Sequence, residues 1–205
     1  MLDTGRSFTV AAWVKLTNTG YRRVVSQDGV LRGGFFLGHH GAANRWSLYL
    51  CHPTDPFSSG CSETALSTSP PTLGTWVHLA GVYDRQAGRI HLYVNGSLED
   101  TKTVSTTRPG AMGPLRIGAG IWNGSPADRF QGSIDDVQVY QEALSASQIA
   151  AIYNGSAPAP DAGVIRTSTA YDQRGLPVSH TDPNGATTEI ENDEAGRPRS
   201  TSLRT

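Results

Sequence analysis

The acidic residues of this chain decide whether it could be a hydrolase. Retaining hydrolysis of a glycosidic bond needs two carboxyl groups about 5–5.5 Å apart. Asp135 and Asp136 are the nearest candidates, but neighbours on an extended strand point to opposite faces, and Glu99 and Asp100 fail for the same reason. The sequence also lacks the Gly-x-Ser-x-Gly, His-Glu-x-x-His and phosphate-loop motifs. We therefore predict that the chain is not an enzyme.

Asp135 is a further acidic residue whose position on a strand raises the question of a partner. It alternates in register with Val137 and Val139, so it is predicted to point at a packed face unless the strand bulges. A buried carboxylate without partners is costly. The sequence leaves two solutions open: hydrogen bonds from backbone N–H groups of a neighbouring loop, or a calcium ion with its six to eight oxygen ligands.

Aromatic rings could stack on the apolar faces of sugars. Three tryptophans fall in strand patterns and are predicted to be core residues: Trp13, Trp46 and Trp76. Trp122 differs, because it lies in a polar, glycine-rich loop at residues 119–126 where a large ring has no obvious core to enter. We take Trp122 as the main candidate for ligand binding, with Asn123 and Asp128 as hydrogen-bonding neighbours. Packing of the ring remains the alternative.

Histidines supply a second, weaker candidate site. His39 and His40 follow a strand pattern, and Asn44 comes shortly after them. They lack a third metal ligand, so they are considered as ligand-binding residues only. His78 and His91 lie inside strand patterns, where a hydrogen-bonded structural histidine is expected.

The two cysteines, Cys51 and Cys61, predict a disulfide. CxxC spacing is absent, and no His–Cys zinc pattern accompanies them. Pro53, Pro56 and Gly60 lie between them, which is typical of a surface loop. A disulfide across this loop predicts a location outside the cytosol.

Composition excludes several other classes of protein. The 205 residues are 37% hydrophobic and 17% charged, which is typical of a folded chain, and the formal net charge is −1. Lys and Arg are scattered, so no basic patch for nucleic acid is expected. No apolar run approaches the roughly 20 residues of a membrane span, and Met1 begins no signal peptide. The chain is therefore either cytoplasmic or a piece of a longer exported protein.

Short strands separated by turns dominate the first 140 residues. Strands are predicted at residues 8–16, 23–26, 34–38, 45–51, 76–83, 89–94 and 115–118. The Asn95-Gly96 pair predicts a tight hairpin. One helix is predicted after Ser145, which can cap it together with Gln148, and the helix should end at Asn154-Gly155. The fold class is therefore all-β, an antiparallel β-sandwich with one short C-terminal helix.

The C-terminal part is predicted to be a separate region. Residues 156–163 alternate Pro and Ala and are expected to form a linker. Residues 164–205 hold an incomplete repeat, because residues 171–177 return as residues 192–198 at an offset of 192 − 171 = 21. The tetrad at residues 182–185 predicts a turn. Each copy should therefore be a short hairpin, and the tail a partial array of such hairpins that needs stacked neighbours for stability.

Residues 1 to about 155 resemble the LamG-like (laminin G-like, concanavalin A-like) jelly-roll family. The resemblance rests on blocks in the family's order, which are residues 7–14, 25–29, 34–38, 76–84, 92–96, 115–118 and 132–145. The tail resembles the YD repeats of RHS-type bacterial surface and toxin-delivery proteins, although Asn192 stands where a tyrosine is expected. The family usually opens with about thirty further residues. We therefore expect that a strand is missing at the N-terminus, that the chain is a segment of a longer exported protein, and that it dimerises or aggregates.

The resemblance also implies a function and a cofactor. Relatives in this family often carry calcium at the rim of the sandwich, which would make Asp28 and Asp128 partners of Asp135. The expected function is a non-catalytic extracellular or cell-surface recognition module that binds a glycan or another surface ligand and belongs to a longer RHS/YD-repeat polypeptide. A structural spacer without a ligand of its own is the main alternative, and a glycoside hydrolase is the third.

Overall fold

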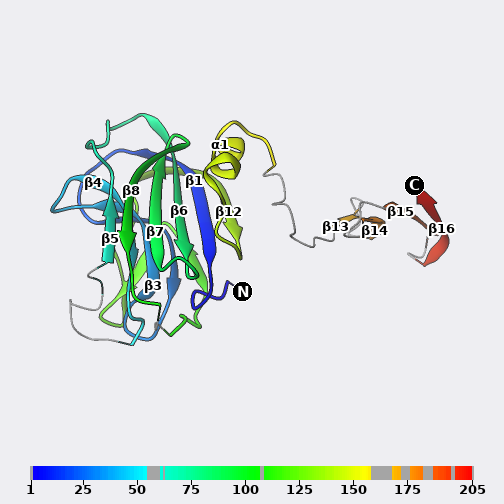
Figure 1. The fold of residues 1–205 in the computed structure, drawn as a ribbon, viewed down its shortest axis with the longest axis horizontal. Helices are drawn as coiled ribbons and strands as arrows, with labels where there is room; N and C mark the ends of the chain where they lie inside the picture. Colours follow the sequence, from blue (N-terminus) through cyan, green and yellow to red (C-terminus); the bar gives the residue numbers. More distant parts are fainter. Residues whose placement is uncertain are drawn as a thin grey trace. The chain divides into compact units, whose positions relative to one another are not determined.

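A computed structural model describes residues 2–54, 61, 63–106, 109–157, 168–171, 176–181, 187–194 and 197–204. The chain forms two compact units, Met1–Pro158 and Ala159–Thr205 (Figure 1). Most of the predicted linker, from residue 158 to residue 163, lies outside the described residues. No helix in the described part of the chain is long and apolar enough to cross a membrane.

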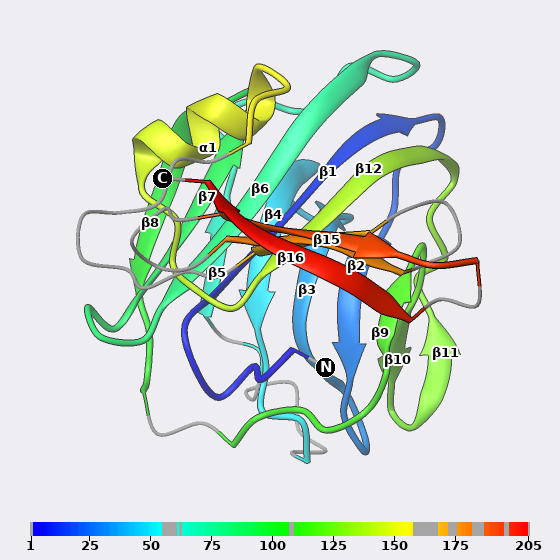
Figure 2. The same ribbon diagram turned by 90° about the vertical axis from the view of Figure 1, so that its right-hand side faces the viewer.

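The first unit is an antiparallel β-sandwich, which confirms the predicted fold class (Figures 1 and 2). One sheet, in spatial order, contains β12 (Gly132–Tyr140), β1 (Phe8–Leu16), β6 (Trp76–Asp84), β7 (Arg89–Val94) and β8 (Ser97–Thr103). The facing sheet contains β5 (Glu63–Leu66), β4 (Arg45–Leu50), β3 (Gly33–His40), β2 (Arg22–Asp28) and β9 (Leu115–Ile117). Every strand pair within the two sheets is antiparallel.

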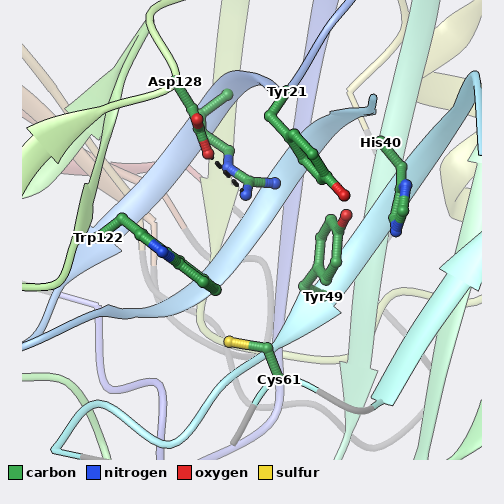
Figure 3. A pocket seen from close by; sticks show the side chains of 7 residues that line it. Tyr21, His40, Tyr49, Cys61, Trp122 and Asp128 are labelled. Atoms are coloured by element: carbon green, nitrogen blue, oxygen red, sulfur yellow. Dashed lines mark ion pairs between the residues drawn. The ribbon is translucent and has the colours of Figure 1, made fainter. Parts of the chain in front are cut away.

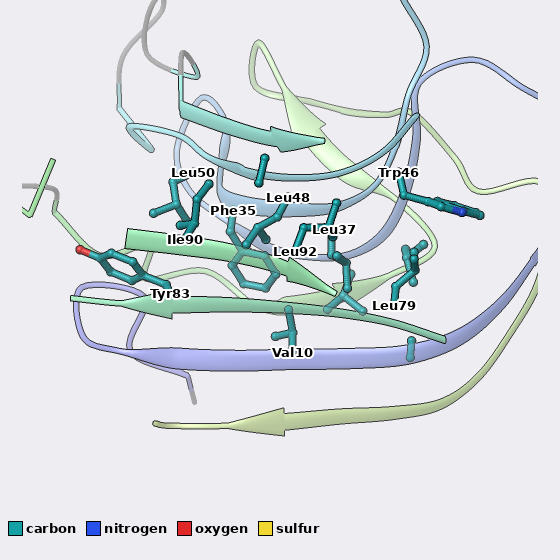
Figure 4. Packing of buried hydrophobic residues seen from close by; sticks show 14 of the residues in the cluster. Val10, Phe35, Leu37, Trp46, Leu48, Leu50, Leu79, Tyr83, Ile90 and Leu92 are labelled. Atoms are coloured by element: carbon teal, nitrogen blue, oxygen red, sulfur yellow. The ribbon is translucent and has the colours of Figure 1, made fainter. Parts of the chain in front are cut away.

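The core lies between the two sheets and follows from strand alternation (Figure 4). Phe8 and Val10 of β1 are fully buried, and they pack with Phe35, Leu37 and Leu48 of the facing sheet in one cluster. Burial of this apolar area is the main favourable term for folding, about 25 cal/mol per Å². Because successive side chains of a strand point to opposite faces, the residues of β3 and β4 between the core positions point away from the core.

The predictions for three tryptophans had different outcomes. Trp46 is buried in the core, as predicted. Trp13 is half-buried on the opposite face of β1, where it stacks on Tyr153. The prediction for Trp76 was wrong, because its side chain is 41% exposed and the Lys15 ammonium lies 5.2 Å from its ring centroid. Val77 and Leu79 of β6 pack in the core, so alternation places Trp76 on the opposite face of the sheet, where it pairs with Lys15.

The outer face of the first sheet is covered by helix α1 (Ala146–Tyr153) (Figure 2). The predicted capping box is present, with Ser145 and Gln148 bonding reciprocally, and Gly155 follows the helix at φ +75°. Ile149 and Ile152 pack on Ala80 and neighbouring residues of the sheet. The apolar residues on one face of β1 therefore pack against the facing sheet, and those on the other face lie on the side covered by α1.

Two Asn-Gly pairs make tight hairpins. The predicted one joins β7 to β8 at Asn95-Gly96. The other joins β10 (Gly120–Trp122) to β11 (Ser125–Ala127) through Asn123 at φ +50° and Gly124 at φ +73°. Positive φ at both central residues is the signature of a type I′ turn. The segment around Trp122, predicted as a loop, is therefore a two-stranded hairpin.

The second unit is a four-stranded antiparallel meander. Its strands are β13 (Ser168–Tyr171), β14 (Pro177–Thr181), β15 (Thr187–Asn192) and β16 (Pro198–Arg204). Tyr171 pairs with Pro177, and Asn192 pairs with Pro198, each just after a register irregularity. Both members of the second pair lie 21 residues after those of the first (192 − 171 = 198 − 177 = 21). The sequence repeat is thus a repeat of strand pairing. Residues 172–175 and the predicted turn at 182–185 lie outside the described residues.

Candidate ligand-binding site

A hollow of about 360 Å³ lies on the side of β2, β3 and β4 that is turned away from the core (Figure 3). Its lining residues are Tyr21, Arg23, His40, Tyr49, Cys61, Trp122 and Asp128. Strand pairing places several of them together, because β3 pairs with both β2 and β4. The β10–β11 hairpin carries Trp122 on its first strand, and Asp128 directly follows its second strand.

A β-bulge places Arg23 in this hollow. Val25 pairs with the core residue Leu37, so simple alternation would point Arg23 toward the core as well. The register of β2 shifts between Arg23 and Val25, however, and Arg23 pairs with Gly38. The extra residue, Val24, reverses the alternation, so Arg23 lies on the outer face.

Arg23 is held by one carboxylate and three aromatic rings. Its guanidinium forms an ion pair of 2.8 Å with Asp128. The guanidinium carbon lies 4.3 Å from the ring centroid of Phe36, 4.9 Å from that of Tyr49 and 5.6 Å from that of Tyr21. Cations over aromatic faces are attracted by the ring quadrupole. The backbone N–H of Arg23 also donates to the Asp128 carbonyl at 2.9 Å, so the β10–β11 hairpin is fixed to β2 at this point.

Several buried polar atoms at the hollow lack good partners. Nε and Nη1 of Arg23 and the hydroxyl oxygen of Tyr49 have no hydrogen bond of normal distance and angle within the described residues. Burial raises the pKa of Tyr49 to about 12, and the nearby Arg23 cation opposes part of this rise. Figure 3 shows the hydroxyl groups of Tyr21 and Tyr49 turned toward one another. Buried groups of this kind are usually satisfied by water or a ligand.

Trp122 forms one wall of the hollow. The Arg32 guanidinium carbon lies 4.2 Å from its ring centroid, and Phe36 lies beside it at 6.4 Å between ring centroids. Figure 3 shows the indole edge-on and directed toward Tyr49 and Cys61. Gly120 allows the hairpin to approach Phe36, because a Cβ at that position would lie 2.6 Å from a ring carbon of Phe36.

His40 forms the opposite wall. Its ring stacks on Tyr49, with 5.4 Å between centroids and 11° between planes. The amide of Ala43 donates to Nδ1 at 3.0 Å, so in the neutral ring the proton lies on Nε2. Burial lowers the pKa of His40, and the nearby Arg23 cation lowers it further, which favours the neutral ring.

The other predicted ligand-binding residues do not line the hollow. His39 is fully buried, and its two ring nitrogens bond with the Gly20 carbonyl at 2.6 Å and with Asn44 Oδ1 at 3.0 Å. His39 and Asn44 thus share a structural hydrogen bond. Asn123 is exposed at the tip of the hairpin. Of the residues predicted from sequence, the structure brings together His40, Trp122 and Asp128, which the sequence had assigned to two separate sites.

The three carboxylates considered as calcium ligands do not converge. Asp28 forms a bidentate ion pair with Arg116, with three contacts of 2.5 to 3.1 Å, and Asp128 is paired with Arg23. Asp135 is exposed, and its carboxylate accepts from the amide of Asp136 at 2.8 Å. Across the described ranges, no three His, Cys, Asp or Glu side chains gather closely enough to hold a metal ion. This donor set does not fit calcium.

The predicted orientation of Asp135 was wrong because β12 bulges. Its pairing with β1 shifts register between Ala11 and Trp13, and Asp136 takes φ +45°. Ile134 and Val137 instead pack against the core, three residues apart rather than two. The bulge therefore turns Asp135 to solvent, where it needs no buried partner.

The predicted disulfide between Cys51 and Cys61 is present and lies beside the hollow. Cys51 packs in one cluster with Phe36 and Tyr49, and Cys61 and Trp122 pack against that cluster. Tyr21, Arg23 and Tyr49 were not predicted as site residues. The one sequence signal that could have helped is Asn123-Gly124, which marks Trp122 as part of a hairpin.

Comparison with known proteins identifies the family of the chain. Residues 1–150 match the family described as the concanavalin A-like lectin/glucanases superfamily, so the chain belongs to it. Human pentraxin-related protein PTX3 is 27% identical in an alignment of 154 residues that covers 70% of this chain and 38% of that protein. The chain thus spans less than half the length of this relative.

Solved structures share the fold at lower identity. The CBM40 of Ruminococcus gnavus IT-sialidase, bound to α2,3-sialyllactose, has a TM-score of 0.59 and 19% identity, covering 72% of this chain and 83% of that one. A SAP-like pentraxin from Limulus polyphemus has a TM-score of 0.52 and 22% identity, covering 72% of this chain and 70% of that one. These likenesses show the fold alone.

Proposed function

We propose that the first unit is a non-catalytic carbohydrate-binding module whose glycan site is the hollow between Trp122, His40 and Asp128. The observation that carries this proposal is the combination of aromatic rings with a partly buried ion pair on an outer sheet face. Aromatic rings offer flat apolar faces, and polar groups at fixed positions give orientation. The hollow combines both within one small volume.

The composition of the hollow argues against hydrolysis. Among its described lining residues Asp128 is the one carboxylate, and it is engaged with Arg23. Hydrolysis of a glycosidic bond uses two carboxyl groups in most families. Several structural neighbours are named as carbohydrate-binding modules, which supports a binding function, whereas others are named as sialidases.

The setting of the module is part of the same proposal. The disulfide is typical of proteins that work outside the cytosol. The 21-residue repeat of strand pairing in the second unit supports a YD-repeat region of an RHS-type polypeptide, so we place the module at the cell surface or outside the cell. A spacer without its own ligand is the competing function, in which water would satisfy the polar atoms of the hollow.

A glycan array with the whole chain tests this function. We expect binding to a defined set of glycans, and loss of that binding in Trp122→Ala. Trp76→Ala is the control, because it removes a tryptophan that is exposed and lies outside this hollow. Repeating the array with added calcium and with a chelator should change nothing, because the carboxylates do not converge. A blank array in every condition would favour the spacer.

A further inference from the structure

We infer that the hollow is selective for neutral sugars and discriminates against acidic ones, with Asp128 as the residue that sets this selectivity. This inference rests on the function proposed above and names the class of its ligand. The reason is that the Asp128 carboxylate is more accessible to a ligand than the Arg23 guanidinium.

The two partners of the ion pair differ in exposure. The Arg23 side chain is 4% exposed, whereas that of Asp128 is 26% exposed. The guanidinium is enclosed by the rings of Phe36, Tyr49 and Tyr21, at 4.3 to 5.6 Å from their centroids. The carboxylate is therefore the more accessible of the two charged groups to a ligand in the hollow.

The two charged side chains that line the hollow form one ion pair, and the Arg32 guanidinium behind its Trp122 wall is 2% exposed, so a ligand does not reach it. Arg23 and Asp128 are its charged lining residues among those described, and they neutralise each other across 2.8 Å. A carboxylated sugar would have to displace Asp128 from Arg23 or lie beside a second carboxylate. Either course costs binding energy, because like charges in a partly buried site repel strongly.

A neutral sugar can form hydrogen bonds with the same groups without displacing the ion pair. An ionised carboxylate has two oxygens with about four acceptor positions, so Asp128 can hold Arg23 and still accept from a ligand hydroxyl. Such charge-assisted hydrogen bonds are stronger than neutral ones. Nε2 of His40 remains as a donor, because Nδ1 accepts from Ala43. Trp122 and Tyr21, which is 42% exposed, supply the apolar faces against which a pyranose or furanose ring can stack.

Matched neutral and acidic probes test the inference by titration calorimetry with the whole chain. The neutral probes are lactose, cellotriose and arabinotriose, and the acidic probes are α2,3-sialyllactose and trigalacturonate. We expect at least one neutral probe to bind, with every acidic probe roughly tenfold or more weaker, which corresponds to one charged hydrogen bond lost. An acidic probe that binds more tightly than every neutral one would overturn the inference while leaving the proposed function intact. Binding of none of the five, together with a blank array, would overturn both.

Asp128→Asn shows whether Asp128 sets the selectivity. Asp128 has φ +54°, a conformation that Asn tolerates well, and its carbonyl bond from Arg23 is kept. We expect neutral binding to fall roughly tenfold, and acidic binding to rise relative to it, because the Arg23 charge is no longer neutralised. Asp135→Asn is the control, since Asp135 is exposed outside the hollow. Unchanged selectivity in folded Asp128→Asn would refute the role of Asp128. If that variant unfolds, the wild-type comparison still decides the ligand class.

Discussion

Removal of the Cys51–Cys61 disulfide tests whether the hollow depends on this covalent link. The cysteines are 10 residues apart. The chain-entropy relation for a loop of this length gives a loss of about 2.7 kcal/mol in the free energy of unfolding. For a unit of this size, each kcal/mol corresponds to roughly 2–4 °C in Tm, so Cys51→Ser/Cys61→Ser should unfold roughly 5–11 °C lower.

Calorimetry of the two proteins, each with and without reductant, measures the effect. Reductant should lower the Tm of the parent protein to that of the double variant and leave the double variant unchanged. Glycan affinity should fall as well, because Cys51 packs with Phe36 and Tyr49 and Cys61 lines the hollow. A Tm within about 2 °C of the parent would contradict this expectation, since it would mean that the link does not restrict the unfolded chain.

Three further perturbations follow from packing and protonation. Leu48→Ala should lower the free energy of unfolding by about 2–5 kcal/mol in denaturant titrations, because Leu48 is fully buried between the sheets; a loss below about 1 kcal/mol would contradict its place in the core. Burial lowers the pKa of His78 from 6.5. The unfolded chain therefore takes up the proton at a higher pH than the folded chain does, so the stability that neutral His78 contributes is complete above about pH 6.5 and is lost as the pH falls below that value. His78→Phe should flatten the fall in Tm between pH 7.5 and 5, and an unchanged slope would assign the fall to other groups. Gly120→Ala should weaken glycan binding at least several-fold and cost roughly 1–3 kcal/mol of stability, because the new Cβ collides with the Phe36 ring; unchanged affinity would show that the hairpin position does not shape the site.

The fold could be predicted from the sequence because its signals are local. Alternation in residues 8–16 gives β1 and its buried face, and the capping residues give α1. Both rest on contacts within a few residues of each other. The hairpin carrying Trp122 was missed although Asn123-Gly124 is the same turn signal as Asn95-Gly96. Its strands are three residues each, too short for alternation to reveal them.

The candidate site could be predicted only in part because bulges reverse alternation. One extra residue in β2 turns Arg23 outward, and a bulge in β12 turns Asp135 into solvent. Neither shift is visible in a single sequence, since a bulge is set by pairing with another strand. His40 and Trp122 were each identified, but they come from β3 and β10, and only the folded sheet shows that they line one hollow.

The most direct test of the central claim is a crystal structure of the whole chain grown with the glycan that binds most tightly on the array. We expect a sugar ring stacked against Trp122 with a hydroxyl hydrogen-bonded to the Asp128 carboxylate. A sugar found instead beside Trp76, or anywhere else outside the hollow lined by Arg23 and His40, would contradict it.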